Sequence, residues 1–313
     1  MSTVLVTGGA GFIGSHLVSR LVENGESVRV LDNFTTGKEE NLNGLKDKVT
    51  IFNGDICDKE TVRKALDGVD YVLHQAALPS VPRSVKDPIA SNRVNVSGTL
   101  NLLVESKNSN VKRFVFASSS SVYGNPDKMP VDESFTPNPL SPYGVTKLSV
   151  EYYGRIFSQI YNLETVGLRY FNVFGPRQDP NSQYSAVIPK FINKILINEN
   201  PVIFGDGEQS RDFSYIDNVV DANMLALTAK NVSGEVFNIA CGERTTLNEM
   251  ITMFGTCLNT NIKAEYTEPR SGDIKHSFAN ISKAKTLLGY QPKVTFKEGL
   301  KKTIDWYKNL NQK

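Results

Sequence analysis

Residues 4–16 read Val4-Leu5-Val6-Thr7-Gly8-Gly9-Ala10-Gly11-Phe12-Ile13-Gly14-Ser15-His16 and place a glycine-rich turn between an apolar run and an amphipathic pattern. Gly8 permits a tight turn, Gly11 lets the backbone approach a pyrophosphate, and Gly14 allows a helix to pack closely on a strand. The N-terminus of that helix offers free N–H groups and a partial positive charge to phosphates. The stretch therefore predicts a dinucleotide-binding turn.

Outward from this turn, short β-rich runs alternate with helical patterns through the first half of the chain. The further runs are residues 28–31, 49–52, 71–73, 113–116 and 165–168. The helical patterns are residues 13–24, 61–66, 88–107 and 142–161. This alternation predicts an α/β fold with a Rossmann-type, doubly wound parallel sheet and a ligand outside the carboxyl ends of its strands.

After Arg169, glycine, proline and asparagine become frequent, and residues 281–307 predict two helical segments around Tyr290-Gln291-Pro292. We expect residues 1–171, with a return at about 216–240, to bind the dinucleotide. Residues 172–215 and 241–313 are then a smaller C-terminal α/β lid that binds the substrate.

The bulk composition excludes several classes of protein. A net charge of +2 over 313 residues provides no general field for nucleic acid. No apolar run reaches the roughly 20 residues that a membrane span needs, and no basic leader precedes the first strand. Three widely separated cysteines imply no disulfide framework, so a reducing, cytoplasmic location is expected. The three histidines and three cysteines lack metal-ligand spacing, so no metal is expected.

Asp32 lies at the end of the second β-rich run, where an acidic side chain can hydrogen-bond the ribose hydroxyls of a dinucleotide. A carboxylate there would repel a 2′-phosphate. The expected cofactor is therefore NAD rather than NADP.

A group of hydroxyls and a lysine predicts chemistry at the same edge of the sheet. Ser118-Ser119-Ser120-Ser121 follows a β-rich run, and Ser141-Pro142-Tyr143-Gly144-Val145-Thr146-Lys147 opens a helical pattern. Tyr143 and Lys147 are i and i+4, on one helix face. A tyrosine with a pKa of about 10 is a poor base at neutral pH, but a nearby ammonium favours its phenolate.

These residues carry a family resemblance that covers nearly the whole chain. The glycine turn, Asp32, Ser119 and the Tyr143/Lys147 pair resemble extended short-chain dehydrogenase/reductases. Residues 168–175, 211–213 and 270–273 resemble stretches of the UDP-sugar 4-epimerases among them, closest to the UDP-N-acetylglucosamine 4-epimerase branch. The resemblance implies catalysis by Ser119, Tyr143 and Lys147.

The resemblance also implies two binding sets. The residues expected to bind NAD are Gly8, Gly11, Phe12, Ile13, Gly14, Asp32, Asn33, Asp55, Ile56, Ala76, Ala77, Asn95, Tyr143, Lys147 and Tyr170. The residues expected to bind the UDP-sugar are Ser80, Ser119, Ser121, Asn172, Val187, Ile188, Phe204, Arg211, Arg270, Asp273 and Ser277. The two arginines suit a diphosphate because a guanidinium can bind it in bidentate fashion.

The residues after Ser119 bear on the reaction. Similar dehydratases carry Asp-Glu directly after the catalytic hydroxyl, and similar decarboxylases carry Glu at the second place, whereas this chain has Ser120-Ser121. Without an added carboxylate, the simplest chemistry is reversible: C4 is oxidised, the 4-keto sugar turns, and the hydride returns to its other face. A net oxidoreductase and a non-catalytic NAD-binding protein of the same fold are the alternatives.

The sugar is predicted from one small residue and two segments. Ser277 occupies a position that is a bulky tyrosine in epimerases restricted to UDP-glucose and UDP-galactose. Residues 74–84 and 175–181 also resemble the acetamido-sugar branch. These features favour UDP-N-acetylglucosamine and UDP-N-acetylgalactosamine, with UDP-glucose and UDP-galactose as further substrates. UDP-glucuronate 4-epimerases share a similar serine run and stay an alternative.

The helical patterns at 88–107 and 142–161 resemble those that pair across a two-fold axis in this family. We therefore expect a homodimer with a four-helix interface.

Overall fold

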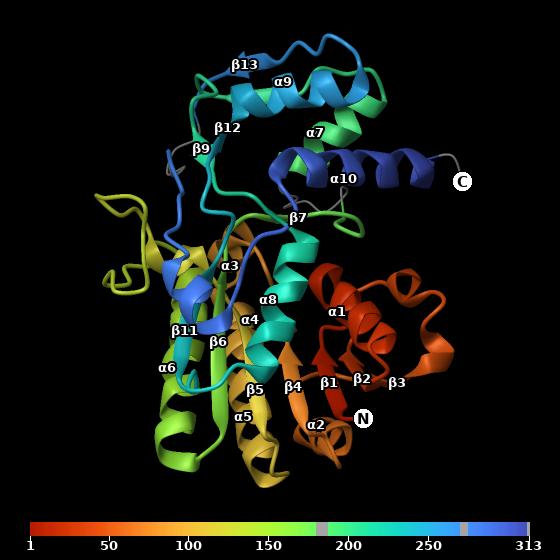
Figure 1. Ribbon diagram of the computed structural model, residues 1–313, viewed down its shortest axis with the longest axis vertical. Helices are drawn as coiled ribbons and strands as arrows, with labels where there is room; N and C mark the ends of the chain where they lie inside the picture. The colour runs from red at the N-terminus through yellow and green to blue at the C-terminus, as the bar shows by residue number, and fades with distance from the viewer. Residues whose placement is uncertain (180–186, 270–274, 312–313) are drawn as a thin grey trace.

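The computed structural model describes residues 1–179, 187–269 and 275–311. Its centre is a seven-stranded sheet in the order β11-β6-β5-β4-β1-β2-β3, with every neighbouring pair parallel (Figure 1). The strands are β1 (Thr3–Thr7), β2 (Ser27–Asp32), β3 (Val49–Asn53), β4 (Tyr71–His74), β5 (Arg113–Ser119), β6 (Glu164–Tyr170) and β11 (Glu235–Ile239). The predicted doubly wound parallel sheet is confirmed.

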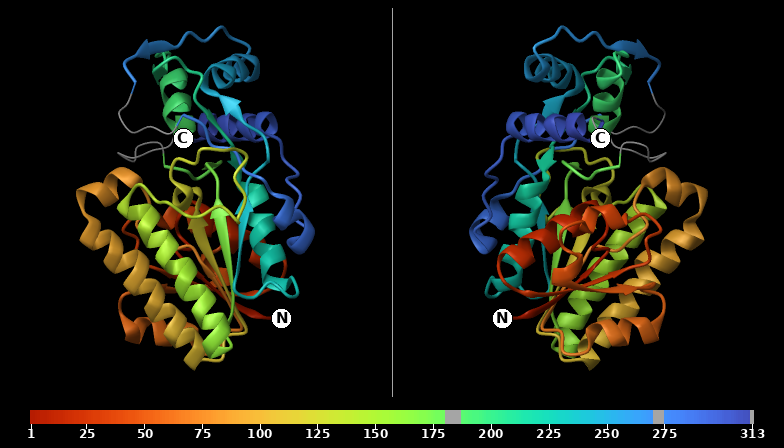
Figure 2. Two further views of the ribbon diagram at one scale, coloured as in Figure 1. Left: turned by 90° about the vertical axis from the view of Figure 1, so that its left-hand side faces the viewer. Right: turned by 90° about the vertical axis from the view of Figure 1, so that its right-hand side faces the viewer.

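Helices cover both faces of this sheet (Figure 2). One face carries α1 (Phe12–Glu23) and α8 (Ile216–Thr228), which pack on each other. The other face carries α2 (Lys59–Leu66), α5 (Thr99–Asn108) and α6 (Pro142–Tyr161). The strands are therefore buried on both sides, which explains their continuous apolar runs.

The long helical pattern at residues 88–107 is helical throughout, as expected, but it contains a π turn. The structure divides it into α4 (Pro88–Asn92), a π-helical turn η3 (Arg93–Gly98) and α5. A π turn adds one residue to a single helical turn, and this local change is too small for a pattern of 3.6 residues per turn to reveal. The turn directs Asn95 toward the loop after β4, whose backbone its side chain binds.

The elements after β6 form a second layer above the carboxyl ends of the strands, which we call the lid (Figure 1), except for α8, β11 and the π turn η5 (Ala284–Leu288), which packs against α8 and β11. Its strands form three short pairs: β7 (Val173–Phe174) with β10 (Ser214–Tyr215), β8 (Val202–Phe204) with β13 (Glu265–Thr267), and β9 (Ser210–Arg211) with β12 (Thr245–Thr246). Its helices are α7 (Val187–Leu196), α9 (Leu247–Leu258) and α10 (Phe296–Asn311).

A cluster of aromatic rings joins the lid elements. Phe174 on β7 makes edge contacts with Phe213, Tyr215 and Phe296, with ring centroids 6.3, 5.6 and 5.3 Å away.

The remaining short elements are α3 (Val81–Lys86) and the 3-10 turns η1 (Glu39–Leu42), η2 (Lys46–Lys48) and η4 (Ser120–Tyr123). Over the described ranges, no helix has the length and apolar character needed to cross a membrane.

Candidate functional site

A cavity of about 550 Å³ lies at the carboxyl ends of the central strands and reaches the lid at Asn172, Val173 and Gln178. It brings together most of the residues expected at the cofactor and all three expected to be catalytic. The expected residues among its lining are Gly8, Gly11, Phe12, Ile13, Gly14, Asp32, Asn33, Asp55, Ile56, Ala76, Ala77, Ser119, Tyr143, Lys147, Tyr170 and Asn172.

The glycine turn forms one wall of this cavity with bare backbone. Gly8 has a φ of +67°, and a Cβ there would lie 2.7 Å from the amide nitrogen of Ala76. A Cβ on Gly14 would lie only 2.1 Å from the carbonyl oxygen of Gly8. The turn can therefore hold no side chains at these positions, and the first residues of α1 border the cavity. This cradle fits a pyrophosphate.

Asp32 ends β2 at the same wall and is held by backbone donors. Its carboxylate accepts hydrogen bonds from the amides of Ala10, at 2.9 Å, and Phe34, at 2.8 Å. Burial raises the pKa of Asp32, and these two N–H donors lower it. An acceptor fixed beside the glycine turn suits the ribose hydroxyls of NAD. The residues present thus fit a dinucleotide.

Helix α6 begins where its sequence predicts and brings the catalytic candidates to the cavity. The Ser141 hydroxyl caps the helix by accepting a hydrogen bond from the Gly144 amide at 3.1 Å, and Pro142 occupies the first turn. Ser119 ends β5, and its side chain lies near Tyr143, whose pKa it lowers. The nitrogen Nζ of Lys147 lies 5.8 Å from the centre of the Tyr143 ring.

Burial shifts both titrating groups of this cluster toward their neutral forms. It raises the pKa of Tyr143 to about 12, against the opposing effect of the nearby Ser119 side chain. It lowers the pKa of Lys147 to about 8, against the opposing charge of Glu151. Lys147 is nevertheless mostly an ammonium at pH 7, so its charge favours the Tyr143 phenolate. The cluster can accept a proton from an alcohol.

Asn95 and Asn172 occupy positions that support the cavity through backbone contacts. Asn95 lies outside the lining and holds Leu78, accepting from its amide at 2.7 Å and donating to its carbonyl at 3.2 Å. Asn172 lines the cavity, but its side-chain nitrogen donates to the carbonyl of Asp212 at 3.0 Å. Both asparagines therefore fix loops that form the cavity wall.

The remaining expected substrate residues lie away from this lining. The positions outside it are Ser80, Ser121, Val187, Ile188, Phe204, Arg211 and Ser277. Arg270 and Asp273 lie outside the described residues. Ser80 caps α3, Ile188 is buried in the lid core, and Arg211 donates to the carbonyls of Ser210 and Lys275.

Several lining residues have no motif that sequence reasoning could use. Gln75, Arg93 and Gln178 all border the cavity, but they come from three distant segments. The Gln178 oxygen Oε1 is buried without a hydrogen-bond partner among the described residues. The Ser84 hydroxyl, also missed, accepts from the Tyr143 amide at 3.0 Å. Of these residues, only Gln75 could have been found from the local sequence, because it directly follows the end of β4.

A buried histidine organises the loop beside the glycine turn. The Thr99 hydroxyl donates to the Asn95 carbonyl at 2.6 Å, so it must accept from Nε2–H of His74 at 2.8 Å. The other ring nitrogen, Nδ1, then accepts from the Thr7 hydroxyl at 2.6 Å. Thr7 in turn accepts from the Ala76 amide at 3.3 Å. The hydrogen bonds thus assign a neutral ring protonated on Nε2.

We predict that protonation of His74 lowers the stability of the protein in mild acid. Burial lowers the pKa of His74 to about 3, whereas an unfolded histidine titrates near 6.5. Below pH 6.5 the unfolded chain takes up the proton first, so stability present above that pH is lost as the pH falls toward 3. Between pH 7 and 5 the wild type should lose about 2 kcal/mol of unfolding free energy relative to His74→Gln. Urea unfolding at both pH values measures this difference, and equal losses in the two proteins would contradict it.

Comparison with known proteins agrees with this geometry. The model of the NAD dependent epimerase/dehydratase family matches residues 4–240. A protein of Methanocaldococcus jannaschii described as a putative UDP-glucose 4-epimerase is 43% identical over 99% of both chains. The solved UDP-N-acetylglucosamine 4-epimerase of Methanobrevibacter ruminantium, in complex with UDP-N-acetylmuramic acid, has a TM-score of 0.94 and 44% identity over 99% of both chains.

A UDP-glucuronic acid 4-epimerase of Bacillus cereus, solved in complex with UDP-glucuronic acid and NAD, has a TM-score of 0.91 and 37% identity over 98% of this chain and 99% of its own. The predicted resemblance to extended short-chain dehydrogenase/reductases is therefore confirmed, and so is the cofactor class. The chain belongs to the NAD dependent epimerase/dehydratase family, among relatives that are UDP-sugar 4-epimerases.

Proposed function

We propose that this protein inverts C4 of a UDP-linked hexose. The observation that carries the proposal is the meeting of Ser119, Tyr143 and Lys147 in the cavity that the glycine turn and Asp32 also line. NAD, when bound, supplies a reversible hydride acceptor and, in its oxidised form, a positive charge. Relatives described as 4-epimerases of three kinds of UDP-sugar support the reaction class.

The protein's own residues perform the proton transfer. Tyr143 takes the proton of the 4-hydroxyl as C4 is oxidised, and it returns the proton after the keto sugar has turned. The Ser119 hydroxyl, which lies near Tyr143 and lowers its pKa, shares that proton. Lys147 stabilises the phenolate by its charge, 5.8 Å from the ring centre. General base catalysis of this kind contributes about 10²- to 10⁴-fold to rate.

The residues beside Ser119 favour epimerisation over elimination or decarboxylation. Ser120 borders the cavity, and the Ser121 amide donates to the Ser119 hydroxyl at 3.2 Å. Neither position supplies a carboxylate. An epimerase returns its hydride in each cycle, so incubation with NAD and a UDP-sugar should give product without net NADH. Continuous NADH formation would instead indicate the alternative, a net oxidoreductase.

We infer that acetamido sugars, UDP-N-acetylglucosamine and UDP-N-acetylgalactosamine, are preferred and that UDP-glucose and UDP-galactose are also accepted. Ser277 supports this preference because a small side chain leaves room for a 2-acetamido group. Its amide donates to the carbonyl of Ser210 at 3.0 Å, in the lid. UDP-glucuronate is the second candidate, favoured by relatives of that description.

The variant Ser277→Tyr tests this sugar preference. A phenol ring at residue 277 should lower kcat/KM for UDP-N-acetylglucosamine about 5- to 150-fold, as overpacking of 1–3 kcal/mol implies. The same variant should keep its activity on UDP-glucose, which serves as the internal control. Equal losses of kcat/KM on both substrates would show that Ser277 does not line the sugar pocket.

We propose that two parts of the chain bind different ligands. Residues 1–171 with 216–240 bind NAD, and residues 172–215 with 241–313 bind the UDP-sugar. The pairing of β11 with β6 and the packing of α8 on α1 support the return of 216–240 to the NAD-binding part. Arg211 and Arg270 are the proposed diphosphate ligands.

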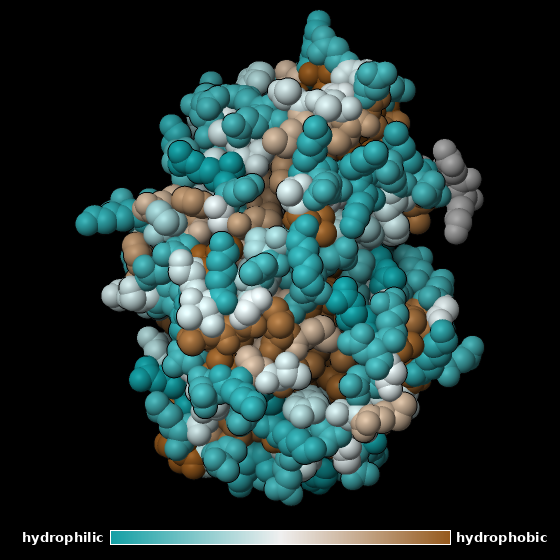
Figure 3. Space-filling model, viewed as in Figure 1, coloured by the Kyte–Doolittle hydropathy of each residue, from teal (hydrophilic) through white to brown (hydrophobic). Residues whose placement is uncertain are grey.

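We also propose a homodimer formed through the outer face of α5 and α6. Large apolar side chains are exposed on that side at Ile89, Val104, Tyr152, Ile156 and Ile160, with Ile89 81% exposed. The face that carries α8 and α1 is mixed, with an apolar area surrounded by hydrophilic residues (Figure 3). An apolar surface of this kind is typical of an interface.

The oligomeric state can be measured directly. Size-exclusion chromatography with light scattering should give twice the chain mass of 34.6 kDa for the wild type. The double variant Ile156→Glu/Ile160→Glu should give one chain mass, because it buries charge in the interface. A wild type that is monomeric at micromolar concentration would contradict the dimer.

A further inference from the structure

Residues at the end of strand β5 contact successive turns of helix α6. The carbonyl of Ala117 accepts a hydrogen bond from Nζ of Lys147 at 2.8 Å. Two residues further along β5, the side chain of Ser119 lies near Tyr143 and lowers its pKa. Both residues of α6 belong to the proposed catalytic cluster.

Ser118, between Ala117 and Ser119, contacts a third turn of α6. The Ser118 hydroxyl donates to Oε1 of Glu151 at 2.5 Å. Glu151 is four residues beyond Lys147, so the two side chains are neighbours on the same face of α6. Both are buried, with 6% of each residue exposed. A buried carboxylate therefore lies one helical turn from the buried lysine.

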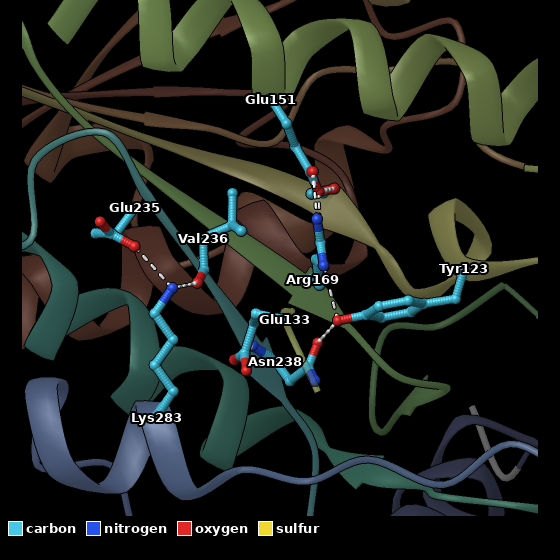
Figure 4. A network of polar contacts seen from close by, with 9 residues as sticks. Tyr123, Glu133, Glu151, Arg169, Glu235, Val236, Asn238 and Lys283 are labelled. Carbon is cyan, nitrogen blue, oxygen red and sulfur yellow. Dashed lines mark hydrogen bonds and ion pairs between the residues drawn. The ribbon is translucent and has the colours of Figure 1, made fainter. Parts of the chain in front are cut away.

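Arg169 on β6 fixes this carboxylate from the opposite side (Figure 4). Its Nε donates to Oε1 of Glu151 at 2.8 Å, and its Nη2 donates to Oε2 at 2.7 Å. The third donor, Nη1, binds the hydroxyl of Tyr123 at 2.7 Å. Such a bidentate pair has both directional and electrostatic strength. Glu151 is thus held by both neighbouring strands.

The network continues beyond Arg169 to the far strand of the sheet. The Tyr123 hydroxyl donates to Oδ1 of Asn238 at 2.7 Å. The Asn238 amide donates to Glu133 at 2.6 Å, and its side chain donates to the carbonyls of Val131 and Asn280. A chain of bonds therefore runs from β5 to β11 and fixes the Glu151 carboxylate one helical turn from Lys147.

We propose that Glu151 is a positioning residue for Lys147: its fixed carboxylate is the buried counter-ion that keeps the Lys147 ammonium charged and directed toward Tyr143. The hydrogen bond that the structure gives Nζ ends on a neutral carbonyl, which does not offset the cost of burying an ammonium. Glu151 supplies the missing negative charge. This inference rests on the proposed function, because it assigns a role within the same cluster.

The role of Glu151 should be measurable as a change in the pKa of Lys147. Burial lowers the pKa of Lys147 to about 8, and Glu151 is the charge that raises it. The titratable and charged groups around this pair are Tyr143 and Arg155 on α6, His74 on β4, Arg169 on β6, Tyr123 on η4, and Glu133, Glu235 and Lys283 beyond them. Removing the charge of Glu151 would also leave Arg169 unpaired, and both changes favour a neutral Lys147.

The test is the variant Glu151→Gln, which keeps the shape of the side chain and removes its charge. The ¹⁵N resonance of the Lys147 ammonium, assigned by its loss in Lys147→Met, should titrate at least about one pH unit lower than in the wild type, without NAD or substrate. In the epimerase assay, kcat should fall at neutral pH, and its alkaline limb should move to lower pH by the same amount. KM should change little, and Glu151→Asp should restore part of the shift.

Glu164→Gln is the matched control. It breaks the ion pair between β5 and β6 in which Arg113 binds Glu164 at 2.6 Å, at the ends of the strands far from the cavity. This variant should leave the Lys147 titration and the pH profile unchanged. If Glu151→Gln does not fold, the double variant Glu151→Gln/Arg169→Gln removes both charges and should still lower the Lys147 midpoint.

A folded Glu151 variant with the wild-type Lys147 midpoint overturns the inference, as does an equal shift in Glu164→Gln. A wild type that epimerises no UDP-sugar overturns the proposed function instead, and the titration of Lys147 still decides the role of Glu151.

Discussion

We expect Tyr143→Phe to lower kcat for epimerisation about 10²- to 10⁴-fold while leaving the affinity for UDP unchanged. The variant removes one oxygen, the proton acceptor in the cavity, and keeps the ring that packs there. It also keeps Lys147 and Ser119 in place, since neither depends on the phenol for its backbone anchor: Lys147 binds the Ala117 carbonyl, and Ser119 binds the Ser121 amide. Steady-state kinetics and UDP calorimetry measure the two quantities.

Tyr161→Phe is the matched control for this prediction. Tyr161 ends the same helix, is 47% exposed, and lies outside the cavity lining. Removal of its hydroxyl should leave kcat unchanged. Near-normal turnover by Tyr143→Phe would exclude Tyr143 as the proton acceptor.

The second large effect concerns the glycine turn. In Gly14→Ala the new Cβ would lie 2.1 Å from the Gly8 oxygen, so the turn between β1 and α1 must open. Strain of about 1–3 kcal/mol at this point should weaken NAD binding about 5- to 150-fold, because the same backbone forms the pyrophosphate cradle. Calorimetry with NAD measures the loss.

Gly25→Ala separates this effect from general backbone strain. Gly25 also has a positive φ, of +77°, but no atom lies within 4 Å of its added Cβ. This variant should lower stability and keep its NAD affinity. Unchanged NAD affinity in Gly14→Ala would mean that the turn tolerates a side chain and does not cradle the cofactor.

The fold could be predicted because its strongest determinants are local in sequence. Glycines 8, 11 and 14 require bare backbone at one turn, and strand–helix alternation requires a parallel sheet. The π turn at Arg93–Gly98 was not predictable in the same way. Its hydrogen bonds reach Leu78 and Thr146, which are distant in sequence.

The candidate site was predictable to a similar degree. Tyr143 and Lys147 share a helix face, and their spacing reveals it. The same spacing extends to Glu151, but a lone glutamate on a helix ordinarily faces water, and only the structure shows Arg169 and Ser118 around it. The substrate side was predicted by resemblance, and Arg270 and Asp273 lie outside the described residues.

The central claim, epimerisation at C4, is tested most directly by the products. Purified protein supplied with NAD is incubated separately with UDP-N-acetylglucosamine, UDP-glucose and UDP-glucuronate, and proton NMR follows the anomeric and H4 signals. We predict conversion of UDP-N-acetylglucosamine to its 4-epimer, with smaller conversion of UDP-glucose. Turnover of only UDP-glucose or UDP-glucuronate would keep the reaction and reject the acetamido preference. No 4-epimer from any of the three would contradict the account.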